Sequence, residues 1–108
     1  MQGETGHLLI LCTCPEAGVA GDIAQALLAD RMAACVNIIP GLSSWFRWQG
    51  RIERADEHLL VIKTTRGRYP DVEKKIRALH PYELPEIIAV PVTGGLGEYL
   101  AWIDQETK

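Results

Sequence analysis

Three side chains in the segment HPYELPEIIAVPV, residues 80–92, could bind a cation or another polar ligand. His80, Glu83 and Glu86 stand there among three prolines. Pro81 disfavours helical backbone at the residue before it, so we expect His80 at the end of a helix. A rigid connection from there to a strand opened by Glu86 favours a small cation or polar-ligand site. The alternatives are that His80 caps helix carbonyls and that Glu83 is a solvated loop residue.

The three cysteines are expected to be reduced thiols, because an odd number cannot all pair within one chain. Cys12 and Cys14 are two apart in an extended segment, so they share a face. They could present two sulfurs to Cu(I), or simply pack in a core as Cys35 is expected to do. A hydrolase or redox enzyme built on Cys12, His80 and Glu86 is disfavoured, because the sequence shows no oxyanion site and no base placed for a nucleophile.

Apolar patterns predict the elements that would position these residues. Segments 7–13 (HLLILCT) and 58–64 (HLLVIKT) resemble each other and are typical of buried strands. A helical pattern and a further apolar run follow each segment. The helical patterns are 19–27 and 69–79, and the apolar runs are 34–39 and 87–92. We therefore predict one α+β domain, residues 1–108, with a ferredoxin-like βαββαβ sheet that carries both helices on one face.

Between the two units, the segment GLSSWFRWQGRIERADEH predicts a long β-hairpin with Gln49 and Gly50 at its tip. Trp45, Phe46 and Trp48 lie close together in it, and neighbouring residues of a strand face opposite sides. One small core cannot cover aromatic rings on both sides, so we expect the hairpin to contact another subunit. The alternative is that the hairpin folds back over its own sheet.

Composition narrows the classes of partner. A net charge of -3, a pI near 5.5 and scattered basic residues disfavour nucleic acid and anionic membranes. No apolar run approaches the roughly 20 residues of a membrane span, and the amino terminus lacks a charged start, so we expect a cytoplasmic protein. The segment TGGLGE lacks the lysine of a phosphate-binding loop and the spacing of a dinucleotide site, which disfavours a nucleotide cofactor.

Four segments, in order, resemble the CutA divalent-cation-tolerance family and together cover nearly the whole chain. They are LCTCPEAGVAGDIAQALLADRMAACVNIIPG, WFRWQGRIE, VIKTT and HPYELPEIIAVPVTGGLGEYLAWI. The resemblance implies a ferredoxin-like core similar to that of the PII signal proteins, a C-terminal helix, and a homotrimer whose hairpins reach between subunits. It also implies a role in tolerance of divalent metals, chiefly copper, and matches the copper ligands to Cys12, His80 and Glu86.

These observations predict a cytoplasmic homotrimer, not an enzyme, that binds Cu(II) or another divalent cation. His80 and Glu86 would be ligands with thiolate help from Cys12, and Glu83 would stay outside the site. Cys14 stands where the family commonly has a small apolar residue, so its sulfur would join or perturb the site. The alternatives are a PII-like sensor of a small ligand bound between subunits, and a signalling or anchoring trimer without a physiological metal.

Overall fold

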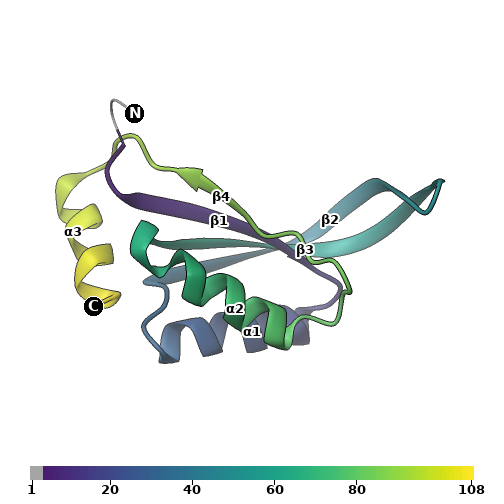
Figure 1. The fold of residues 1–108 in the computed structure, drawn as a ribbon, viewed down its shortest axis with the longest axis horizontal. Coiled ribbons are helices and arrows are strands. Elements are labelled where there is room, and N and C mark those ends of the chain that lie inside the picture. Colours follow the sequence, from purple (N-terminus) through teal and green to yellow (C-terminus); the bar gives the residue numbers. More distant parts are fainter. Residues whose placement is uncertain (1–3) are drawn as a thin grey trace.

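The computed structural model describes residues 4–108, which form one antiparallel sheet and three α-helices (Figure 1). The sheet has the strand order β2-β3-β1-β4, and α1 and α2 lie against the same face of it. This is the predicted ferredoxin-like arrangement. In chain order the elements are β1 (His7–Cys14), α1 (Ala17–Ala29), β2 (Cys35–Trp48), β3 (Arg51–Thr65), a 3-10 turn (Arg66–Arg68), α2 (Tyr69–Leu79), β4 (Ile88–Pro91) and α3 (Gly97–Glu106).

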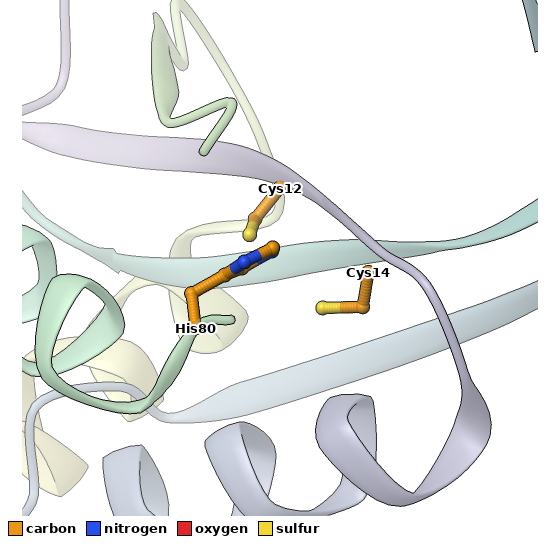
Figure 2. Close-up of side chains that lie close together, drawn as sticks. All are labelled: Cys12, Cys14 and His80. Atoms are coloured by element: carbon orange, nitrogen blue, oxygen red, sulfur yellow. The ribbon is translucent and has the colours of Figure 1, made fainter. Parts of the chain in front are cut away.

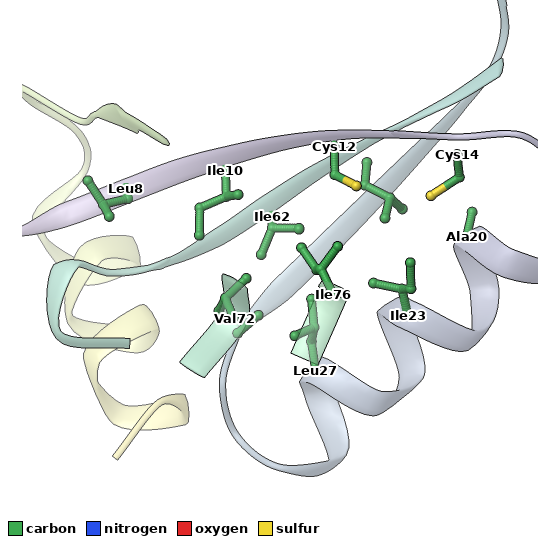
Figure 3. Close-up of a cluster of buried hydrophobic side chains, with 12 residues drawn as sticks. Leu8, Ile10, Cys12, Cys14, Ala20, Ile23, Leu27, Ile62, Val72 and Ile76 are labelled. Carbon is green, nitrogen blue, oxygen red and sulfur yellow. The ribbon is translucent and has the colours of Figure 1, made fainter. Parts of the chain in front are cut away.

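The hydrophobic core lies between the sheet and the helices α1 and α2 (Figure 3). Its members recur at every second position in the strands and at every three or four positions in the helices, as those structures require. A large apolar side chain buried there contributes about 1.5–3 kcal/mol. The core includes Leu8, Ile10, Cys12 and Cys14 from β1, Leu60 and Ile62 from β3, and Ala20, Ile23, Leu27, Val72 and Ile76 from the helices. Both cysteines of β1 therefore face the helices.

The hairpin of β2 and β3 extends well beyond the rest of the sheet (Figure 1) and does not fold back over it. Its tip is the predicted one, because Gln49 and Gly50 both have positive φ, at 51° and 77°, as a tight two-residue turn demands. The register places Trp45 and Ile52 on one side of the ribbon and Phe46 on the other. In the single chain Trp45 and Ile52 are each 69% exposed.

The connection from α2 to β4 carries His80, Glu83 and Glu86. As predicted, α2 ends at His80, whose backbone is extended (φ -79°, ψ 134°) and whose N–H still donates to the Ile76 carbonyl at 2.8 Å. Strand β4 is shorter than the predicted 87–92 and pairs only with Leu8–Leu11 of β1. The end of β1 that carries the two cysteines therefore lies beyond the reach of β4.

Helix α3 packs at the opposite end of the sheet from the hairpin tip (Figure 1). The buried ring of His7 holds it there, with Nε2 lying 3.0 Å from the Leu100 carbonyl and 2.9 Å from Asp104 Oδ1. The described helices contain no segment whose length and hydropathy would suit a membrane span.

Candidate metal centre

Three potential ligand atoms gather inside the protein near the end of β1 (Figure 2). The sulfurs of Cys12 and Cys14 and a ring nitrogen of His80 all lie within 4.8 Å of one another. Atoms bound to one ion at distances typical of zinc are at most about 4.6 Å apart, so a small shift would let a single ion reach all three. The exposed fractions of the three residues are 0%, 0% and 8%, which makes the cluster a buried one.

Local sequence rules place each of these side chains. Cys12 and Cys14 share the helix-facing side of β1 because side chains alternate along a strand. His80 stands at the end of α2 because Pro81 excludes helical backbone at the preceding residue. The predicted partners Cys12 and His80 are therefore brought together, and Cys14 joins them.

The hydrogen bonds of the His80 ring identify which of its two nitrogens carries the proton. Its Nδ1 lies 3.1 Å from the N–H of Tyr82 and can only accept, so Nε2 carries the proton and donates to the Thr13 carbonyl at 2.7 Å. Thr13 lies past the part of β1 that pairs with β4. Histidines that bind metals usually donate their second N–H to a carbonyl or carboxylate in this way. An ion at the other nitrogen, Nδ1, would have to displace the N–H of Tyr82. The bond to the Thr13 carbonyl would serve equally well in a purely structural role, because it holds the end of α2 against β1.

The two thiols hold their protons unequally. The hydrogen bond with Cys14 raises the pKa of the Cys12 thiol, and burial and the charges of Glu86 and Glu57 raise it further. Conversely, the hydrogen bond from Cys12 lowers the pKa of the Cys14 thiol, against the opposing effect of burial. The first thiolate therefore forms on Cys14, and its negative charge disfavours a second thiolate on Cys12.

Glu86 is not a member of the buried cluster. It is half-buried and lines an open groove of about 960 Å³ between the hairpin and the loop that follows α2. Burial raises the pKa of Glu86, and the charge of Glu57 adds to that effect. Glu57 itself is only 6% exposed and accepts a hydrogen bond from the Tyr82 hydroxyl at 2.7 Å. Glu83 also borders the groove and is exposed, as expected of a loop residue.

His58 is a neighbour of the cluster that sequence reasoning missed. It stands directly opposite Cys14 in the ladder between β1 and β3, so both side chains face the helices. Among the described residues, its Nδ1 is a buried atom with no hydrogen-bond partner. The resemblance between segments 7–13 and 58–64 showed that both are strands, but it could not show which residues face each other.

The ligand set of the cluster suits a soft or borderline metal ion. Two thiols and an imidazole favour copper or zinc, whereas magnesium and calcium prefer oxygen ligands. Residues 4–108 contain no other group of three His, Cys, Asp or Glu side chains whose ligand atoms lie equally close together. The cluster therefore fits a copper or zinc ion, and the carboxylate of Glu86 lies outside it.

Comparisons with known proteins agree over nearly the whole chain. The family model for the CutA1 divalent ion tolerance protein matches residues 8–106. The divalent-cation tolerance protein CutA of Thermus thermophilus is 48% identical over 99 residues, which make up 92% of this chain and 96% of that protein. Human protein CutA is 45% identical over 96 residues, which make up 89% of this chain and 54% of that protein. The crystal structure of CutA from Xylella fastidiosa matches with a TM-score of 0.94 at 45% identity, covering 96% of this chain and 100% of that one.

Proposed function

Because this chain belongs to the CutA1 divalent ion tolerance family, we propose that it is a cytoplasmic homotrimer that binds copper and is not an enzyme. Bacterial relatives of similar length are named for tolerance of divalent cations and not for a reaction. The acidic balance of the chain, with a net charge of -3, is compatible with a role in binding cations. In this proposal, binding of the ion underlies the tolerance.

The observation that supports copper binding is the meeting of Cys12 and His80 inside the fold. Their ligand atoms lie within 4.8 Å of each other, in the company of a second thiol. Sites of nitrogen and sulfur ligands bind copper more tightly than the other divalent first-row metals. For Cu(II), which also accepts carboxylate oxygen, Glu86 in the adjoining groove remains a predicted ligand.

Titration with Cu(II) under anaerobic conditions tests this proposal. The informative variant is His80→Gln, because the glutamine amide can still donate to the Thr13 carbonyl but cannot supply the Nδ1 lone pair. We expect His80→Gln and Glu86→Gln each to weaken Cu(II) binding about tenfold or more. The exposed Glu83→Gln is the matched carboxylate control and should bind as the parent does. If His80→Gln binds Cu(II) as tightly as the parent, copper binding at this site is refuted.

The exposed apolar surface of the single chain supports the trimer. The hairpin presents apolar side chains on both sides, and the sheet face away from α1 and α2 is apolar as well. Exposed residues on that face include Ile39, Ile88 and Val90, and half-buried ones include Leu9, Leu11 and Val61. Surface of this kind usually marks an interface, and cyclic closure covers it without open-ended growth. Light scattering should give three times the chain mass of 12.0 kDa.

The groove beside the hairpin could bind a small ligand, which is the basis of a second candidate function, that of a sensor. Its lining combines Trp45 and Trp48 with the carboxylates of Glu53, Glu57 and Glu86. Such a surface disfavours phosphates and favours cations, which aromatic faces also attract. Titration with a panel of nucleotides should therefore show no binding, and tight nucleotide binding without copper binding would favour the sensor.

A further inference from the structure

We propose that the buried cluster holds reduced copper, Cu(I), through Cys12, Cys14 and His80, with Glu86 outside the ligand set. This inference rests on the proposed copper-binding function and specifies the oxidation state of the ion and its ligands. Cys14 thereby takes the place that the family resemblance gives to Glu86.

The short distances from Cys14 to the other two ligand residues indicate that Cys14 is the third ligand. Its sulfur lies within 4.8 Å of both the Cys12 sulfur and the His80 ring nitrogen, whereas no Glu86 oxygen belongs to that group. The two cysteines lie on a regular strand in the core of the protein, so their side chains are held by packing before any ion arrives. A preorganised pair of ligands loses little conformational entropy when it binds.

The number and the softness of the ligands favour Cu(I) over Cu(II) and Zn(II). Thiolate is a soft ligand that selects Cu(I), whereas carboxylate suits harder ions. In the described part of the chain, no fourth His, Cys, Asp or Glu atom lies within 4.8 Å of all three ligands. Structural zinc sites are almost always four-coordinate, so a buried site with three ligands fits Zn(II) poorly.

In this proposal the ion binds His80 through Nδ1, because Nε2 donates to the Thr13 carbonyl. An ion there displaces one hydrogen bond, the 3.1 Å contact with the N–H of Tyr82. The shorter bond from Nε2 to the Thr13 carbonyl, 2.7 Å, stays in place and keeps the ring oriented. Binding exchanges the two thiol protons of Cys12 and Cys14 for one Cu(I) ion, and both protons pass to the solvent without any change of oxidation state.

Competition with a chromophoric Cu(I) chelator in the absence of oxygen tests the proposal. We expect Cys14→Ala to weaken Cu(I) binding about a hundredfold or more. Loss of a residue that only hydrogen-bonds to a metal ligand already weakens binding by up to about that factor, and Cys14 is proposed as a ligand itself. Glu86→Gln is expected to weaken the binding of Cu(II) but should bind Cu(I) as the parent does, because the Glu86 carboxylate lies outside the buried cluster. Cys35→Ala is the matched thiol control, because Cys35 is half-buried on β2 and outside the cluster, and it should also be unchanged.

Folding of each variant is checked by circular dichroism and light scattering. Should Cys14→Ala be unstable because it leaves a void, Cys14→Val fills the position with an apolar side chain and carries the same expectation. X-ray absorption at the copper edge should show fewer sulfur neighbours in either variant than in the parent.

The outcomes separate this inference from the function on which it rests. If Cys14→Ala and Cys14→Val bind Cu(I) like the parent, or Glu86→Gln is weakened as much as they are, the inference fails. If Zn(II) at equal concentration displaces Cu(I), the inference that the cluster selects Cu(I) fails. In both cases binding of Cu(II) that depends on His80 would leave the proposed function standing, whereas a chain that binds neither Cu(I) nor Cu(II) refutes both.

Discussion

Removing the His80 ring should destabilise the metal-free protein by an amount that its hydrogen bonds define. His80→Ala leaves the Thr13 carbonyl and the Tyr82 N–H without their partners, at contacts that measure 2.7 and 3.1 Å in the parent. A buried polar group without a partner costs about 1–3 kcal/mol. The Tyr82 N–H lies on a half-exposed loop and can turn to water, so we expect a loss of about 2–4 kcal/mol.

Two further substitutions at the same position separate the two hydrogen bonds. His80→Gln can still donate to the Thr13 carbonyl, and His80→Asn can still accept from the N–H of Tyr82. The Thr13 bond is the shorter one and joins the helix end to β1, so Gln should retain more stability than Asn, and both more than Ala. Urea unfolding of metal-free protein at one fixed concentration measures this order. A free energy of unfolding for His80→Ala within about 0.5 kcal/mol of the parent would show that these hydrogen bonds do not stabilise the fold, because surface substitutions alone cause changes of that size.

Three other substitutions test separate parts of the structure. His58→Val removes a buried nitrogen without a partner and puts a good strand former in its place, so the free energy of unfolding should rise by about 1 kcal/mol; a loss of stability would contradict this. The raised pKa of Glu86 means that the folded state holds its proton more tightly than the unfolded chain, so stability falls as pH rises from below the ordinary glutamate value through the raised one. Glu86→Gln should therefore melt higher than the parent at pH 7 and equally at acidic pH, and a lower melting temperature at pH 7 would contradict the sign. Trp45→Ala should leave the fold intact but weaken association on dilution, as followed by light scattering, because this ring is 69% exposed in the single chain; unchanged association would place it outside the interface.

Local patterns in the sequence predicted the βαββαβ core, because strand and helix periods were clear in both halves of the chain. The C-terminal helix α3 was implied only by the family resemblance. The sequence predicted an apolar run at 34–39 and, separately, a long hairpin in the segment that begins GLSSWFRW, but the structure joins the run and the first arm of the hairpin into the single strand β2. Pro40 and Gly41 form an irregularity between Ile39 and Leu42 that keeps the strand continuous. A bulge absorbs extra residues without ending a strand, and only the pairing with β3 distinguishes it from a turn.

The candidate site was predictable in part. The shared face of Cys12 and Cys14 follows from strand alternation, and the position of His80 follows from Pro81. That the end of α2 returns to the end of β1 is a property of the whole topology, which local patterns do not contain. The location of Glu86 in the groove depends on the path of the loop between α2 and β4, and no periodicity describes that path.

A structural role and a metal-binding role for His80 are not exclusive, because both use the bond from Nε2 to the Thr13 carbonyl. That bond joins α2 to β1 in the metal-free protein, and it would also hold the ring in one orientation while an ion binds. Loss of copper binding in His80→Ala alone therefore cannot distinguish a lost ligand from a distorted site. Cys14 offers the cleaner separation, because in the core its thiol contributes packing that an apolar side chain of similar size can replace. If Cys14→Val keeps the stability of the parent and loses Cu(I), the cluster is a metal site built into the core and not merely part of the packing.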